Sequence, residues 1–184
     1  MEITGEYRIP APRRQVWAAL NDPDILRQCI PGCEALERTA DETLEATVLA
    51  KVGPVKARFK GKVTLSDLKP PESYVISGEG AGGVAGFARG EAKVSLREDG
   101  GSTVLTYAAD ATVGGKLAQI GSRLIDATAR KMADEFFDKF SAVAGGVAVE
   151  PPTEAEPRGL SPWVWVPALI ALIGAVLWYF GGAN

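Results

Sequence analysis

The strongest pattern along the chain is an alternation of apolar and polar residues, which predicts β-strands with one buried face. In 55–66, apolar or small residues occupy the odd positions, and basic or hydroxyl residues occupy the even positions. Because successive side chains of a strand point to opposite faces, this period of two predicts a strand with one face inside. Turn signals such as Gly53-Pro54 and Asp99-Gly100-Gly101 separate the segments. The expected strands are 3–9, 44–52, 55–66, one beginning at 74–76, 89–96 and 105–113.

Two short helices and one long helix are expected from apolar residues at helical spacing. The segment 13–20 carries three such residues, and 24–29 has the pattern of a second short helical turn. After Gly114-Gly115, a strongly amphipathic helix is expected over 116–144, with a length of about 43 Å. Its broad apolar face comprises Leu117, Ile120, Leu124, Ile125, Thr128, Met132, Phe136, Phe140 and Val143.

The order of these elements predicts an α+β fold in which a curved antiparallel sheet grips the long C-terminal helix. No crossover helix interrupts the run of strands. The inward strand positions are often small, namely Ala46, Ala50, Ala57, Gly61, Ala92, Ala109 and Ala111. Two alternatives stay open at this point: an apolar cavity large enough for a lipid-like ligand, or larger neighbouring side chains that close the gap.

A glycine-rich segment at 78–90 stands between two expected strands. No helix follows it, so it does not match a dinucleotide or phosphate loop. One interpretation is a mobile hairpin with Phe87 at its tip, which gates the cavity. The other is a hairpin with bulges that requires glycine at positive φ. Ile30-Pro31 is expected to flank the same entrance as Phe87.

Basic residues occupy the outward face of the strand expected at 55–66. They are Lys56, Arg58, Lys60 and Lys62. One interpretation is contact with anionic lipid headgroups or an acidic partner surface, and the other is an ordinary solvated strand face. Phe137 falls on the polar side of the predicted helix, so we expect it either to contact a partner or to pack under the linker.

The C-terminal region predicts a membrane anchor. Residues 163–180 carry no charge and would span about 27 Å as a helix, close to the hydrocarbon thickness of a bilayer. Trp and Tyr residues stand at both ends, as at two membrane interfaces. The expected organisation is a globular domain at 1–144, a Pro- and Glu-rich linker at 145–160 and a single-pass anchor at 161–184. Arg158 places the globular domain on the cytoplasmic face of the inner membrane by the positive-inside rule.

The composition argues against several classes of chemistry. The chain has no histidine, which removes the common proton shuttle and metal ligand. Its net charge is −3, so nucleic-acid binding is not expected. Cys29 and Cys33 have no second pair to complete a zinc site, and Asp110 and Asp126 are lone carboxylates. We therefore expect no catalytic residue, no metal and no covalently bound cofactor.

Three segments resemble the CoxG family, the G subunit of the aerobic carbon monoxide dehydrogenases, within the START-related (SRPBCC) superfamily of helix-grip proteins. They are 20–34, with Asn21-Asp-Pro-Asp24 and Cys29-Ile-Pro-Gly-Cys33; 78–90, with Ala85-Gly-Phe-Ala88; and 114–125, followed by Ala133-Asp-Glu-Phe-Phe137. The resemblance covers about residues 1–144. It implies an accessory subunit, rather than the catalyst, that recruits a molybdenum hydroxylase of the carbon monoxide dehydrogenase type to the cytoplasmic membrane. A lipid quinone, menaquinone or ubiquinone, would carry electrons from that enzyme to the respiratory chain.

The leading hypothesis is a membrane-anchored module that binds this quinone between the sheet and the long helix. The expected ligand-binding residues are Ile30, Pro31, Phe59, Gly61, Phe87, Tyr107, Ala109, Leu117, Ile120, Leu124, Thr128, Met132 and Phe136. One alternative is a purely structural anchor without a small ligand. Another is an enzyme acting on an apolar substrate, as some members of the superfamily are.

Overall fold

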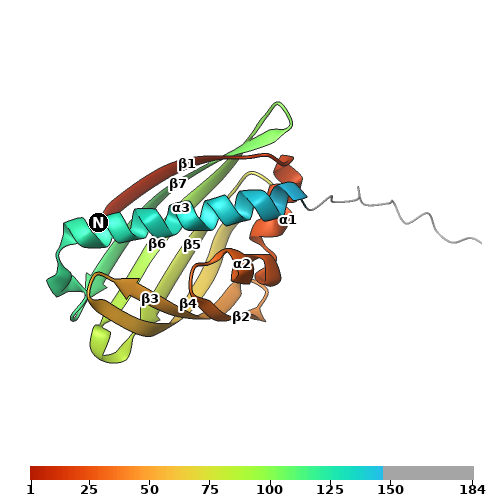
Figure 1. Cartoon of the computed structure of the whole chain (residues 1–184). Helices are drawn as coiled ribbons and strands as arrows, with labels where there is room; N and C mark the ends of the chain where they lie inside the picture. Colours follow the sequence, from red (N-terminus) through yellow and green to blue (C-terminus); the bar gives the residue numbers. More distant parts are fainter. Residues whose placement is uncertain (147–184) are drawn as a thin grey trace, which may run out of the picture. The chain divides into compact units, whose positions relative to one another are not determined.

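The computed structural model describes residues 1–146, which form one curved antiparallel sheet with a long helix lying across it (Figure 1). The strands are β1 (Glu2–Ile9), β2 (Cys33–Ala40), β3 (Thr43–Val52), β4 (Val55–Lys69), β5 (Ser73–Ala81), β6 (Phe87–Asp99) and β7 (Ser102–Gly114). The helices are α1 (Arg13–Leu20), α2 (Pro23–Cys29) and α3 (Ser122–Gly146), with two short 3-10 helices, η1 (Gly83–Ala85) and η2 (Ala118–Ile120).

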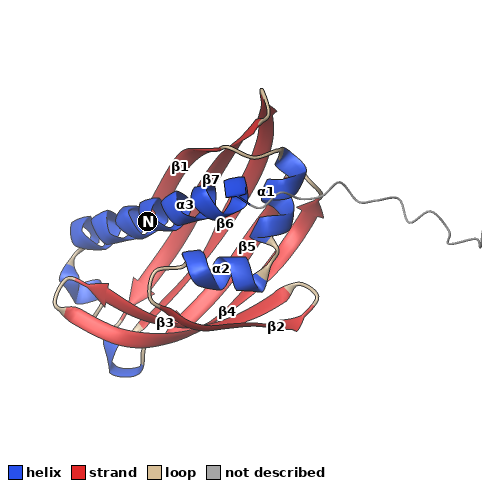
Figure 2. Ribbon diagram, turned by 45° about the vertical axis from the view of Figure 1, so that its right-hand side comes forward, coloured by secondary structure: helices blue, strands red, loops and turns tan. Residues whose placement is uncertain are grey.

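The seven strands follow the order β1-β7-β6-β5-β4-β3-β2, and every neighbouring pair is antiparallel. From β2 to β7 each strand pairs with the next one in the chain, whereas α1 and α2 carry the chain from β1 at one edge to β2 at the other. Figure 2 shows α3 crossing the concave face of the sheet, with α1 and α2 near its C-terminal end. The interior therefore lies between the inward faces of the strands and one face of α3.

Most predicted elements are present, and local sequence signals explain their ends. The helix predicted over 13–20 has the bounds of α1. The carboxylate of Asp22 caps α2 by accepting hydrogen bonds from the backbone N–H of Asp24 (2.8 Å) and Ile25 (3.3 Å). Gly100 and Gly101 have φ values of 58° and 82°, as the β6–β7 hairpin requires. The predicted α+β class and the curved antiparallel sheet are thus confirmed.

The sequence did not predict β2. This edge strand lacks a regular alternation because its second half is exposed on both faces, and its pairing with β3 shifts register twice. The segment Cys33–Ala40 therefore shows no period of two, although Leu36 contributes to the interior.

The prediction of a helix beginning at Lys116 was wrong. The chain first forms η2, and Gly121 then adopts a φ of 96°, which breaks any continuous helix. The helix α3 begins at Ser122 and runs for 25 residues, or about 37 Å. Leu117 and Ile120 consequently lie before α3 and do not share its apolar face.

The most densely packed part of the interior lies where α1, α2 and the C-terminal end of α3 meet the sheet. Phe140 of α3 is fully buried there, together with Ile9, Val16 and Leu105. The buried hydroxyl of Thr103 donates a hydrogen bond of 2.7 Å to the carbonyl oxygen of Ala11, so this polar group is satisfied inside the core.

The predicted anchor at 161–184 and nearly all of the predicted linker lie outside the described residues. Within residues 1–146, no helix is both long and apolar enough to cross a membrane. The proposed boundaries at 144 and 160 therefore stay predictions.

Candidate functional site

An apolar cavity of about 420 Å³ lies between the concave face of the sheet and α3. The sheet contributes mainly Leu, Val, Ile and Ala side chains, α2 contributes Leu26 with Ile30 at its end, and α3 contributes two alanines and two phenylalanines. The lining residues are Ile3, Leu20, Leu26, Ile30, Leu36, Leu44, Ala46, Val63, Leu65, Tyr74, Ile76, Ala92, Val94, Leu105, Tyr107, Ala109, Ala129, Ala133, Phe136 and Phe137. No charged side chain lines it within the described part of the chain, so the cavity suits an apolar ligand.

The cavity exists because side-chain size falls along the inward positions of neighbouring strands. The inward residues are Leu96, Val94, Ala92 and Gly90 on β6, and their partners on β7 are Leu105, Tyr107, Ala109 and Ala111. Ala129 and Ala133 of α3 line the same space from the other side. Two layers of small side chains therefore face each other, and the larger neighbours do not close the gap.

Glycine also lets the strands around this space approach one another closely. A Cβ atom at Gly90 would lie 2.4 Å from the carbonyl oxygen of Asp110, and one at Gly61 would lie 3.1 Å from that of Glu79. Any other residue at Gly90 would require the neighbouring backbone to move. The glycine-rich middle of the sheet is thus part of what shapes the cavity wall.

Four of the thirteen predicted ligand-binding residues line the cavity. They are Ile30, Tyr107, Ala109 and Phe136. Pro31, Phe59 and Gly61 do not line it, and the ring of Phe59 instead covers the backbone at Gly82. Four sheet residues in the lining, Leu44, Val63, Ile76 and Leu105, stand at inward positions of the predicted alternation and were identifiable from the sequence.

The helix residues predicted to bind ligand are mostly on the wrong side of α3. Leu124, Thr128 and Met132 do not line the cavity, and Leu124 is 42% exposed. Leu124 instead lies close to Gly53 in the β3–β4 turn, as does Ile120. The inward face runs through Ala129, Ala133, Phe136, Phe137 and Phe140. The predicted arc was broad, and the sheet selects a face rotated from its centre toward the alanines.

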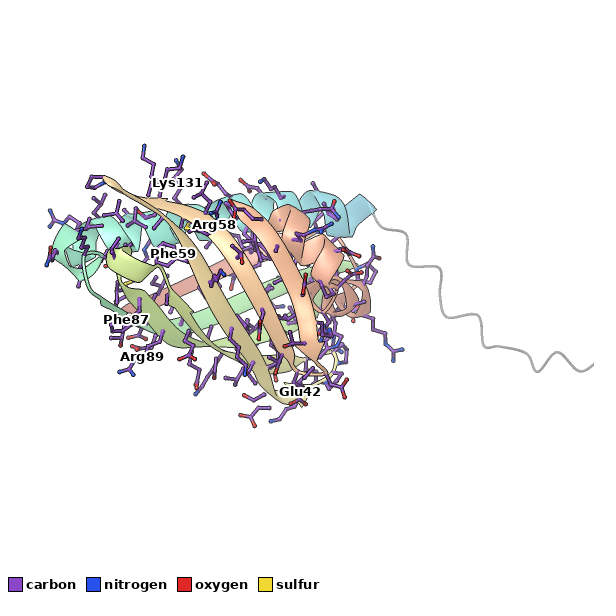
Figure 3. The ribbon with its side chains drawn as sticks, turned by 90° about the horizontal axis from the view of Figure 1, so that it is seen from below. Glu42, Arg58, Phe59, Phe87, Arg89 and Lys131 are labelled. Atoms are coloured by element: carbon purple, nitrogen blue, oxygen red, sulfur yellow. The ribbon has the colours of Figure 1, made fainter. Side chains whose placement is uncertain are left out.

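Phe87 does not lie at the tip of the β5–β6 hairpin and does not reach the cavity. It begins β6 on the outer face, where its ring covers the backbone at Gly114 (Figure 3). The tip is formed by η1, and its Val84 is 85% exposed. Gly83 and Gly86 have φ values of 58° and 110°, so the interpretation that glycine serves positive φ is confirmed, without bulges in the pairing of β5 with β6.

The basic residues of β4 lie on the outer face and are partly neutralised there. Arg58 forms a bidentate ion pair with Glu34 of β2, with N–O distances of 2.5 and 3.0 Å (Figure 3). The hydrogen bonds from Arg58 lower the pKa of Glu34. Lys62 stands opposite Glu45 on β3 and Glu79 on β5. Only the end of the stripe near the β3–β4 turn, where Lys56 faces Lys51, lacks an acidic neighbour in register.

Phe137 lies inside, and its placement on the polar side of the helix was wrong. Its ring stacks on Tyr7 of β1 at a centroid distance of 4.1 Å and lines the cavity. The Tyr7 hydroxyl donates a hydrogen bond of 2.7 Å to Oδ1 of Asp134 on α3. Burial, the bond to Asp134 and the proximity of Tyr107 raise the pKa of Tyr7. Sequence reasoning missed this cluster because it joins residues more than a hundred positions apart.

The reactive side chains outside the cavity do not form a catalytic constellation. Burial raises the pKa of the Cys29 and Cys33 thiols, so both stay protonated at neutral pH. Asp110 is exposed and lies 3.9 Å from the N-terminal ammonium group. One oxygen of Asp126 is buried without a hydrogen-bond partner among residues 1–146. In the same region no group of three or more acidic, cysteine or histidine side chains is placed to hold a metal ion.

Comparison with known proteins identifies relatives of the described domain. Residues 5–145 match the model of the CoxG family, which is the G subunit of carbon monoxide dehydrogenase. A conserved protein of known structure from Geobacillus kaustophilus is 32% identical, with a TM-score of 0.74 over 78% of this chain and 95% of that one. No curated protein matches the chain.

Two more distant structures share the fold alone. A START superfamily protein from Mycobacterium smegmatis has a TM-score of 0.61 at 12% identity, and the match covers 78% of this chain and 96% of that one. The Zhui aromatase/cyclase from Streptomyces sp. R1128 has a TM-score of 0.58 at 13% identity, covering 78% and 93%. The helix-grip architecture of the START-like proteins is therefore shown for the described domain.

Proposed function

This chain belongs to the CoxG family of carbon monoxide dehydrogenase, and from this premise we propose that it is a membrane-anchored accessory subunit that binds a lipid quinone. The observation that carries the proposal is the apolar cavity under α3. Its volume of about 420 Å³ lies within the range of small-molecule sites, roughly 300–1,000 Å³. A quinone ring fits such a site because the ring is flat and largely apolar, and its isoprenoid tail continues the apolar character.

The proposed partner is a molybdenum hydroxylase of the carbon monoxide dehydrogenase type, as the family name implies. The uncharged segment 163–180 supports an anchor in the cytoplasmic membrane, with the globular domain on the cytoplasmic face. In this arrangement the domain brings a quinone, menaquinone or ubiquinone, to the recruited enzyme. The basic end of the β4 stripe at Lys51 and Lys56 supports contact with anionic headgroups or with an acidic surface of the partner.

We propose a binding role rather than catalysis by this chain. Its relative in fold, the Zhui protein, is an aromatase/cyclase, so the architecture alone is compatible with an enzyme. The chain has no histidine, and the cavity lining among residues 1–146 holds no carboxylate for general acid–base chemistry. The two tyrosines of the lining are better suited to hydrogen bonding with a ligand.

The direct test is to identify what the full chain carries. The protein is purified from membranes in a mild detergent, extracted with organic solvent and analysed by mass spectrometry for isoprenoid quinones. We expect close to one quinone per chain, and saturable binding when quinone is added to the extracted protein. A chain that contains no quinone and binds none would leave only the structural anchor, which would still bring the dehydrogenase to the membrane.

A further inference from the structure

A chain of polar groups leads from the cavity wall to the surface at the seam between β1 and α3. Tyr107 lines the cavity, and its ring lies parallel to that of Tyr7 at a centroid distance of 6.2 Å. The hydroxyl of Tyr7 in turn donates to the exposed carboxylate of Asp134. Phe137 stacks on Tyr7 and covers both tyrosine rings from the helix side. The order from the interior outward is therefore Tyr107, Tyr7 and Asp134.

Gly5 fixes the position of Tyr107 in this arrangement. The two residues are directly paired between β1 and β7. A Cβ atom at Gly5 would lie 2.5 Å from Cε1 and 2.9 Å from the hydroxyl oxygen of Tyr107. Only glycine lets the ring lie flat across β1, which brings its hydroxyl toward Tyr7. The hydrogen-bond interaction with Tyr107 contributes to the raised pKa of Tyr7, in agreement with this placement.

The carboxylate at the outer end gives the chain of groups a direction. A carboxylate only accepts hydrogen bonds, so the single proton of Tyr7 is committed to Asp134. The Tyr7 oxygen is then available to Tyr107 only as an acceptor. When Tyr107 donates its own proton to Tyr7, the lone pairs of its oxygen are left for a donor in the cavity. A ring hydroxyl satisfies this requirement, whereas a ring carbonyl has no proton to give.

We propose that Tyr107, oriented through Tyr7 by Asp134, is the headgroup subsite of the cavity and prefers a ring hydroxyl to a ring carbonyl. This inference rests on the proposed function, since it concerns the redox form of the same ligand. A quinol carries hydroxyls where the quinone carries carbonyls, so the site binds the reduced form more tightly. One hydrogen bond of this kind corresponds to about a three- to tenfold difference in affinity. By linkage, a tenfold preference raises the two-electron midpoint potential of the bound ligand by about 30 mV.

The test compares the two redox forms of one probe on the full chain. Decylubiquinone and its chemically reduced quinol are titrated anaerobically against the purified protein in an amphipathic polymer, and the midpoint potential of the bound probe is measured. We expect the quinol to bind about three to ten times more tightly. In Tyr107→Phe, which keeps the ring, the preference should disappear. Tyr7→Phe interrupts the same chain one step further out and provides a second, independent variant.

Two further variants separate orientation from general polarity. In Asp134→Asn the amide can donate to Tyr7, so the direction is no longer imposed and the preference should fall toward one or reverse. Tyr74→Phe removes the other tyrosine hydroxyl of the lining and should leave the preference unchanged. Equal affinity of the wild-type protein for both forms, or a preference that persists in Tyr107→Phe, would overturn the subsite while quinone binding stands. Failure of the wild-type protein to bind either form would remove the proposed function as well.

Discussion

The concave face of the sheet is filled at one end and hollow in its middle, although the same strands supply both regions. Near α1 its inward residues are large, and Phe140, Ile9 and Leu105 pack there without access to solvent. Farther along the same strands the inward positions hold residues such as Ala92 and Ala109. The helix changes in the same way, since α3 presents phenylalanines to the filled end and alanines to the hollow one.

This difference teaches that stability and binding are assigned to separate parts of one interior. Buried apolar area at the filled end supplies the free energy that holds α1 and α3 on the sheet. The side chain of Gln15 strengthens that end by donating a 2.6 Å hydrogen bond to the carbonyl oxygen of Ala144. The hollow part gives up such packing, and a cavity of this size is retained against the usual density of protein interiors. Variants at the two ends should therefore fail in different ways.

The largest expected effect is loss of stability from Phe140→Ala at the filled end. The side chain is fully buried, so its removal should lower the free energy of unfolding by about 3–5 kcal/mol. Urea denaturation followed by circular dichroism measures the change. Phe87→Ala is the matched control, because Phe87 is 45% exposed and its removal should cost about 1 kcal/mol. Equal losses in the two variants would show that the interior is not divided as described.

The next effect is a loss of binding without loss of stability from Ala109→Phe. The larger side chain would occupy the hollow, so affinity for decylubiquinone should fall at least about a hundredfold, or roughly 2.7 kcal/mol. The free energy of unfolding should change by less than about 1 kcal/mol, since overpacking is costly only where the interior is already filled. Titration and urea denaturation of the same samples test both statements.

Ala108→Phe is the control for this variant, because Ala108 is exposed on the opposite face of the same strand. It should leave both affinity and stability close to those of the wild-type protein. If Ala109→Phe destabilised the domain by several kcal/mol, the middle of the sheet would be packed in solution rather than hollow. If the variant kept its affinity, the ligand would bind elsewhere.

How much of this division was predictable follows from the type of periodicity involved. In strands the period of two fixes which side chains face inward, and the decline from Leu96 to Gly90 could be read directly from every second residue. Small inward residues such as Ala109 therefore pointed to the cavity before the structure did. The edge strand β2 escaped prediction because exposure on both faces of its second half removes the alternation.

The helix side was less predictable because its broad apolar arc allows several rotations. Met132 and Ala133 are neighbours about 100° apart on the helix, and only packing against the sheet decides that Ala133 faces the cavity. The start of α3 depended on the positive φ of Gly121, which no periodicity reveals. Phe137 was misplaced for the same reason, and with it the contact to Tyr7 that closes the β1 side of the site.

A smaller effect is expected from a buried polar group at the filled end. In Thr103→Val the hydroxyl that binds the carbonyl oxygen of Ala11 is replaced by a methyl group of similar size. The carbonyl loses its partner inside the core, so the free energy of unfolding should fall by about 1–2 kcal/mol, with unchanged ligand affinity. Thr106→Val, on the exposed face of the same strand, should change stability by about 0.5 kcal/mol or less. A drop in affinity for Thr103→Val would show that the two regions are coupled.

The smallest effect should come from the ion pair that spans the outer face of the hollow part. Glu34 and Arg58 join β2 to β4 across β3, yet both side chains are largely exposed, so the pair contributes little at neutral pH. Because Arg58 lowers the pKa of Glu34 in the folded state, this contribution is complete above the ordinary carboxyl range and is lost as the pH falls through it. The urea midpoints of wild-type protein and Glu34→Gln should therefore differ slightly at pH 7 and converge near pH 3. A large difference at pH 7 would mean that the hollow part, lacking a packed core, depends on its surface pairs for stability.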